Sequence, residues 1–81
     1  MTRTEALDLV HQARNHAEQL KAEGRLRYTS ADPGCPDVLW LAALTEELGE
    51  VARCIHDNDR DSLALELAQL AGVAVGKLET L

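Results

Sequence analysis

Apolar residues recur every three or four positions in three separate segments of this 81-residue chain, and this spacing restricts the possible folds more than any other feature. The first stripe consists of Ala6, Leu9, Val10, Ala13, Ala17 and Leu20; the second of Leu41, Leu44, Leu48, Val51 and Ile55; the third of Leu63, Leu67, Leu70, Ala74 and Leu78. This period is that of amphipathic helices, whose apolar stripes face a core. The two-residue alternation of strands is absent, so the sequence predicts an all-α fold.

The predicted elements form a single domain over residues 1–81, with helices at residues 3–23, 38–56 and 60–80 and a loop at residues 24–37. The start of the first helix carries a capping box formed by Thr2 and Glu5. The second and third helices are separated by only a few residues, so they are expected to form an antiparallel helix hairpin.

The third helix is apolar on nearly every side, which predicts association between copies of the chain. Between Leu63 and Gly76 only Glu66 and Gln69 are polar. A chain this short buries only about 60% of its unfolded surface, so a core of its own is marginal. We therefore expect a homo-oligomer, a dimer or a tetramer, in which the three-helix subunits build a four-helix-type core. The small residues Ala68, Ala71 and Gly72 are expected to allow the close helix contact.

Charge and cysteine content exclude several classes of function. The net charge of −6 leaves no broad basic surface for a nucleic-acid polymer. The most apolar stretch is shorter than the ~20 residues of a membrane span, and no signal peptide precedes it. Cys35 and Cys54 have no Cys-x-x-Cys spacing and suit free thiols. The expectation is a cytoplasmic protein without a membrane or nucleic-acid partner.

Acidic residues interrupt otherwise apolar rows on the second and third helices. Glu47 and Glu50 lie in the row that runs from Trp40 through Ala43 to Cys54, and Glu46 is their neighbour. Buried carboxylates are costly unless they are paired or bind a metal, and Mg²⁺ prefers oxygen ligands. The alternative is that these carboxylates are solvated, or form salt bridges with arginines such as Arg53.

Two short motifs at a restricted distance resemble the MazG-like all-α nucleoside triphosphate pyrophosphohydrolases. The run Leu44–Ala52 matches the E-E-x-x-E pattern of that family through Glu46, Glu47 and Glu50. After a gap of about one helix hairpin, Glu66–Gln69 matches its E-x-x-D pattern, except that Gln69 stands where the family has Asp. The resemblance covers about half of the chain, from Trp40 to Leu81.

The resemblance implies Mg²⁺-dependent hydrolysis, with Mn²⁺ as a substitute, of a nucleoside triphosphate to the monophosphate and pyrophosphate. It assigns Glu47, Glu50, Glu66 and Gln69 as metal ligands, and Glu46 and Glu47 as catalytic residues. The amide of Gln69 removes one negative charge from the family's ligand set, and the chain lacks the family's frequent fourth helix. Both departures leave open an alternative function, a non-catalytic helical oligomer that binds a nucleotide or a protein partner.

Two further residues are candidates for contact with the substrate. Lys77 lies on the Glu66 side of the third helix and could reach a phosphate, although a cation near a helix C-terminus also stabilises the helix dipole. Trp40 could stack on a base, although a tryptophan in an apolar row is also typical of a core or an interface.

Overall fold

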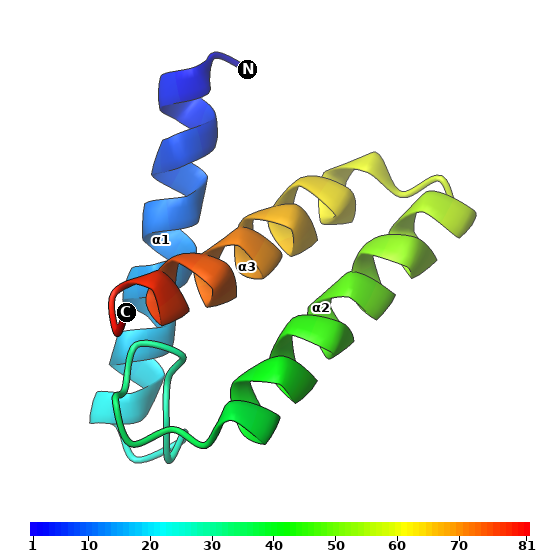
Figure 1. The fold of residues 1–81 in the computed structure, drawn as a ribbon. Coiled ribbons are helices and arrows are strands. Elements are labelled where there is room, and N and C mark those ends of the chain that lie inside the picture. Colours follow the sequence, from blue (N-terminus) through cyan, green and yellow to red (C-terminus); the bar gives the residue numbers. More distant parts are fainter.

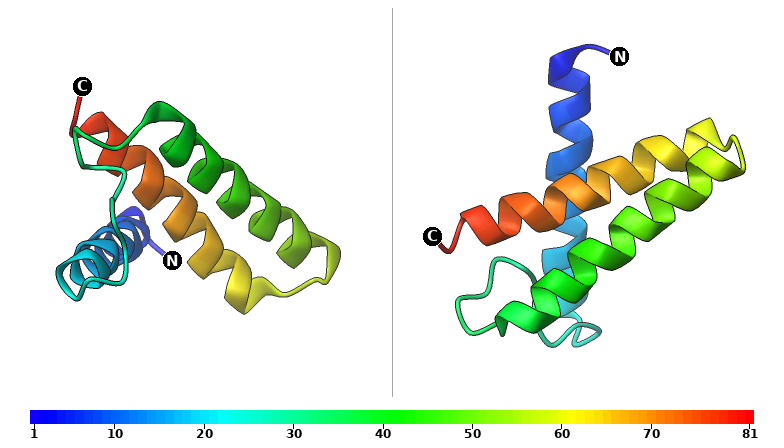
Figure 2. Two further views of the ribbon diagram at one scale, coloured as in Figure 1. Left: turned by 90° about the horizontal axis from the view of Figure 1, so that it is seen from below. Right: turned by 45° about the vertical axis from the view of Figure 1, so that its right-hand side comes forward.

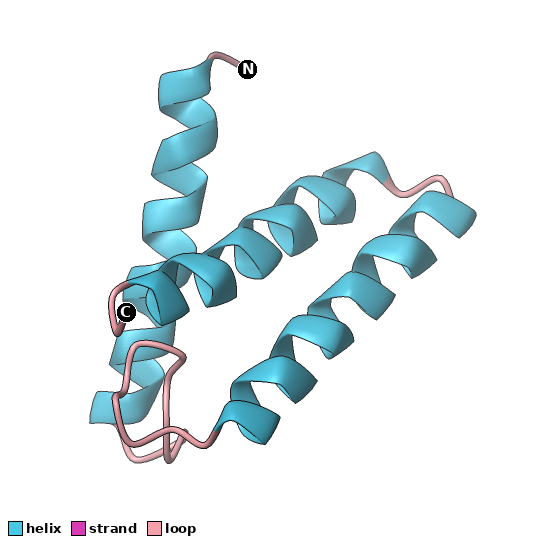
Figure 3. Ribbon diagram, viewed as in Figure 1, coloured by secondary structure: helices cyan, strands magenta, loops and turns pink.

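The computed structural model describes residues 1–81 and contains three α-helices and no strand (Figure 1; Figure 3). Helix α1 comprises Arg3–Ala22, α2 comprises Asp37–His56 and α3 comprises Arg60–Leu78. The prediction of an all-α fold is confirmed. None of the three helices is both long enough and apolar enough to cross a bilayer.

Local sequence signals fix the helix ends. The backbone N–H of Glu5 donates to Thr2 Oγ1 at 3.1 Å, and the backbone N–H of Thr2 donates to Glu5 Oε1 at 3.0 Å, so the predicted capping box is present. Gly24 has a φ of +76°, which lets the chain leave α1 without a steric penalty. Asp59 caps α3 by accepting from the backbone N–H of Ser62 at 3.1 Å.

Helix α3 lies between the other two helices and is the one that contacts both (Figure 2). It runs back along α2 after a short connection, whereas α1 crosses its C-terminal half (Figure 1). Val51 and Cys54 of α2 pack against Leu63 of α3, and Leu70 extends this small core.

Most of the predicted apolar stripe of α2 is not covered within one chain. Leu41, Leu48 and Ile55 are 53%, 57% and 61% exposed, and only Val51 of the five stripe residues is buried. The prediction that this stripe faces a core is therefore wrong for the single chain. The reason is that α3 covers the neighbouring side of α2, and α1 does not contact α2.

The small residues of α3 are divided between two sides of the helix. A Cβ added to Gly72 would lie 3.4 Å from Ala13 Cβ, so α1 packs directly on this glycine. Ala68, one turn earlier, is also buried. The predicted contact of Gly72 and Ala68 with a second copy is corrected accordingly, because contacts within the chain already bury them. Ala71 is only half-buried.

Candidate functional site

A cavity of about 540 Å³ opens where the three helices and the loop after α1 meet. Its volume lies in the range of about 300–1,000 Å³ that is common for small-ligand sites. The space exists because small side chains line it from three helices, namely Ala13, Ala17, Ala43 and Gly72. Trp40, Glu47 and Gln69 also line it.

Gln69 links Glu47 of α2, which lines this cavity, to Glu66 of α3, which does not line it. With its nitrogen turned toward the carboxylates, the Gln69 amide donates to Glu47 Oε2 at 3.1 Å and to Glu66 Oε2 at 3.2 Å. Both glutamates are half-buried. Glu47, Glu66 and Gln69 were predicted from motifs on two different helices. In the structure they form one hydrogen-bonded group.

The pKa of Glu47 is raised to about 7, well above its ordinary value of 4.5. Burial is the largest cause, because it removes water from the charged form. A hydrogen bond to Glu66 and the negative charges of Glu66, Glu46 and Glu50 raise it further. Near neutral pH the Glu47 side chain is therefore protonated in a large fraction of molecules and can donate to Glu66.

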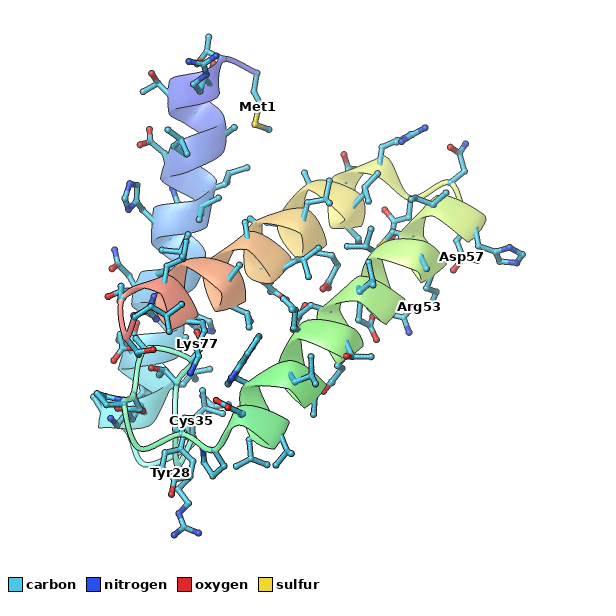
Figure 4. The ribbon with its side chains drawn as sticks, viewed as in Figure 1. Met1, Tyr28, Cys35, Arg53, Asp57 and Lys77 are labelled. Atoms are coloured by element: carbon cyan, nitrogen blue, oxygen red, sulfur yellow. The ribbon has the colours of Figure 1, made fainter.

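The other predicted ligands and catalytic residues are placed differently. Glu50 forms an ion pair with Arg53, which points away from α3 (Figure 4). Glu46 is exposed and does not line the cavity. No group of three or more His, Cys, Asp or Glu side chains is arranged to hold a metal ion. Of the predicted ligand set, the structure brings together Glu47, Glu66 and Gln69, but not Glu50.

Two carboxylates and one amide of this group match the oxygen ligands that Mg²⁺ prefers. Mg²⁺ keeps several waters and is commonly bound through one or two carboxylates together with substrate phosphates. Glu47 and Glu66 supply two carboxylates, and Gln69 supplies an amide that could turn its oxygen inward. A cation there would also remove the repulsion between two half-buried acids.

Trp40 and Lys77 form a cluster at the N-terminal end of α2. Lys77 Nζ lies 5.3 Å from the centroid of the Trp40 ring and 3.3 Å from Asp37 Oδ1. Trp40 Nε1 donates to the same carboxylate oxygen at 3.1 Å. These hydrogen bonds, that of Trp40 first, lower the pKa of Asp37. Trp40 lines the cavity, whereas Lys77 does not, so Lys77 acts on the cavity through the indole that it contacts.

One wall of the cavity, which α1 and the loop provide, was not predicted from the sequence. Arg14 lies in this wall, and its nearly buried guanidinium donates to Glu79 at 2.8 Å and to Glu18 at 3.0 Å. Tyr28 and Thr29 complete the wall from the loop. The sequence does contain a signal that Arg14 faces the interior. Arg14 lies four residues after Val10 and three before Ala17, so it shares the apolar face of α1.

No family model, no curated protein and no solved structure matches this chain. The similarity to the MazG-like enzymes therefore depends on the two short motifs alone.

Proposed function

We propose that this chain is a Mg²⁺-dependent nucleotide pyrophosphohydrolase of the MazG-like kind, which converts a nucleoside triphosphate to the monophosphate and pyrophosphate. The observation that carries the proposal is the pair that Glu47, which lines a cavity of ligand size, forms with Glu66 behind it. Two neighbouring carboxylates without a basic partner suit a divalent cation and the phosphates that such a cation binds.

In this proposal each group of the cavity has a defined task, and Glu47 has two. Glu47 and Glu66 hold the metal, with Gln69 as a neutral neighbour that orients both carboxylates. When bound, Mg²⁺ neutralises phosphate charge and lowers the pKa of a coordinated water. Trp40 offers an aromatic surface to the base, and Lys77 keeps that indole in place.

We assign proton uptake from the attacking water to Glu47 and not to Glu46. Glu47 lines the cavity, so it lies beside the space that the phosphates and the attacking water would occupy. The side chain of Glu46 is exposed and does not line the cavity. Its charge affects the site only at a distance, by helping to raise the pKa of Glu47.

One observation favours the second candidate function, a non-catalytic protein that binds nucleotides. Glu50 is held by Arg53, and Gln69 carries no charge, so only two carboxylates face the metal position. Fewer negative ligands weaken metal binding, above all where a reaction requires two metal ions. Such a protein would retain the cavity and bind a nucleotide without turning it over.

Release of pyrophosphate from a panel of nucleoside triphosphates, with and without Mg²⁺, tests the proposal. We expect Mg²⁺-dependent release from at least one nucleotide and its loss in Glu47→Gln, with Glu46→Gln retaining most of the rate. Calorimetry with the same nucleotides separates the two candidates. Binding without release of pyrophosphate supports the non-catalytic function, and absence of both binding and release contradicts both.

The proposal includes self-association of the chain, as a dimer or a tetramer. A single chain of this size leaves many apolar side chains exposed on α2 and α3, among them Leu41, Leu48 and Leu67. Contiguous exposed apolar surfaces normally mark an interface.

A further inference from the structure

The cavity of the candidate site has a charge balance opposite to that of the whole chain. The chain contains 14 Asp and Glu residues against 8 Lys and Arg residues, and its net charge is −6. Among the charged side chains that line the cavity, by contrast, Arg14 and Arg27 are cationic and only Glu47 is acidic. Cationic side chains gathered in a cavity of an acidic protein indicate a ligand that carries negative charge.

Arg14 does not provide a free positive charge to the cavity. Its guanidinium donates to Glu79 at 2.8 Å and to Glu18 at 3.0 Å, and neither glutamate lines the cavity. Glu79 directly follows α3, so these ion pairs join α1 to the end of α3. The charge of Arg14 is therefore balanced within the protein, and its role is to hold the wall of the cavity in place.

Arg27, in the loop after α1, is the cation of the cavity that has no acidic partner. Arg25, two residues earlier, pairs with Glu23 at 3.8 Å, whereas Arg27 forms no ion pair. The Cζ atom of Arg27 lies 5.3 Å from the centroid of the Tyr28 ring. Such a contact supports a guanidinium without neutralising it. Because Arg27 is exposed and Tyr28 is half-buried, the guanidinium is held at the mouth of the cavity.

The proposed ligand requires a cation in addition to the metal. A nucleoside triphosphate carries more negative charge than one divalent cation neutralises, and the carboxylates of Glu47 and Glu66 add to the excess. Lys77 does not line the cavity and pairs with Asp37. The excess negative charge can thus be met only from the wall that the loop provides. An arginine suits this task, because its guanidinium donates two parallel N–H bonds to phosphate oxygens.

We propose that Arg27 binds the phosphate groups of the ligand whose charge the metal does not neutralise. The inference rests on the proposed function for the kind of ligand, but it concerns binding and not turnover. It also makes Arg27 a specificity-determining residue. A ligand with a chain of phosphate groups gains affinity from Arg27, whereas a nucleoside without phosphate gains none.

Inorganic tripolyphosphate is the probe for this inference, because it has a phosphate chain but no base that could stack on Trp40. Its dissociation constant is measured by calorimetry with excess Mg²⁺ for the wild type, Arg27→Gln and Arg25→Gln, with circular dichroism as the check on folding. Arg25 is the matched control, since it lies in the same loop but does not line the cavity. We expect binding to the wild type, a dissociation constant at least about tenfold higher in Arg27→Gln, and a change within about twofold in Arg25→Gln.

Arg27→Lys separates the charge of the side chain from its packing on Tyr28. Lysine keeps the charge but not the planar pair of donors, so its dissociation constant should lie between those of the wild type and Arg27→Gln. Three results overturn the inference: no binding of tripolyphosphate to the wild type, equal weakening in Arg25→Gln and Arg27→Gln, and binding to Arg27→Lys that is no tighter than to Arg27→Gln.

The inference and the catalytic proposal can fail separately, because calorimetry with tripolyphosphate does not require turnover. Arg27-dependent binding of tripolyphosphate, with no pyrophosphate released from any nucleotide, supports the inference and contradicts catalysis. Mg²⁺-dependent release of pyrophosphate with the same KM in the wild type and Arg27→Gln contradicts the inference and leaves the catalytic proposal intact.

Discussion

With its amide nitrogen turned toward the carboxylates, Gln69 donates to Glu47 on α2 and to Glu66 on α3, with nitrogen–oxygen distances of 3.1 Å and 3.2 Å. Helices that are separate in the sequence therefore place two acids side by side in a half-buried position. The position of Gln69 between them explains how the pair is tolerated without a metal. The amide satisfies one oxygen of each acid, and a proton on Glu47 removes one of the two charges.

The first prediction concerns the pH dependence of folding stability. The pKa of Glu47 is raised from 4.5 to about 7 in the folded chain. The folded state then binds more protons than the unfolded state between these values, so the contribution of Glu47 to stability is complete below about pH 4.5 and is lost as the pH rises through about 7. Urea unfolding at about pH 5 and about pH 8 should show this decline in the wild type and a smaller one in Glu47→Gln.

Glu46→Gln is the matched control for this pH dependence. The substitution removes the same charge at the position next to Glu47, but the side chain of Glu46 is exposed. We expect Glu46→Gln to retain most of the decline between about pH 5 and about pH 8. An equal flattening in both variants would mean that the general negative charge of α2, and not the Glu47–Glu66 contact, governs the effect.

The second prediction concerns Gln69→Asp. Without metal, the substitution removes the shared donor and adds a third acid, so the free energy of unfolding should fall by about 1–2 kcal/mol. With Mg²⁺ in excess, the added negative ligand should raise metal affinity and restore the stability. Chemical unfolding with Mg²⁺ and with a chelator measures both effects.

Gln19→Asp, on the exposed side of α1, controls for the added charge in that experiment. Its stability should not respond to Mg²⁺. If Gln69→Asp is also indifferent to Mg²⁺, residue 69 does not face a metal position.

The sequence predicted where the helices lie better than it predicted which part of the protein covers each apolar stripe. The capping box of Thr2 and the apolar period give the elements, because these signals are local. The same period marks Leu48 as apolar, but it does not say whether the covering helix belongs to the same chain. The structure shows that no helix of this chain covers it fully, so the prediction of a core position failed there.

The candidate site shows the same division between local and tertiary signals. Motif spacing selected Glu47, Glu66 and Gln69, and the structure places them together. Spacing could not decide the orientation of Glu50, because Arg53 lies one turn further along α2 and competes for its carboxylate. The contribution of Tyr28 required the path of the loop, which the turn residues alone do not specify.

The third prediction concerns the docking of the loop on α3. A Cβ added at Gly76 would lie 2.0 Å from Ser30 Oγ and 3.1 Å from the backbone nitrogen of Ala31. The serine side chain can turn away, but the backbone must shift, so Gly76→Ala should destabilise the fold by about 2 kcal/mol. Thermal or urea unfolding at one fixed protein concentration measures the change.

Gly49→Ala is the control for glycine replacement within a helix. Nothing lies within 4 Å of a Cβ at this position, so alanine should stabilise α2 by about 0.5–1 kcal/mol. Opposite signs for the two variants are expected. A stabilising Gly76→Ala would mean that the loop does not pack on α3 in solution.

The last prediction uses the single tryptophan as a reporter of the cavity. Trp40 lines the cavity and is the only tryptophan of the chain, so its fluorescence should change when a nucleoside triphosphate binds with Mg²⁺. Ala43→Leu would fill part of the same space and should weaken nucleotide binding at least about tenfold. Ala42→Leu, on the adjacent exposed position, adds the same volume outside the cavity and should bind as the wild type does. Equal affinities for the two variants would show that the nucleotide binds elsewhere, and the assignment of Trp40 and Glu47 to one substrate pocket would then be wrong.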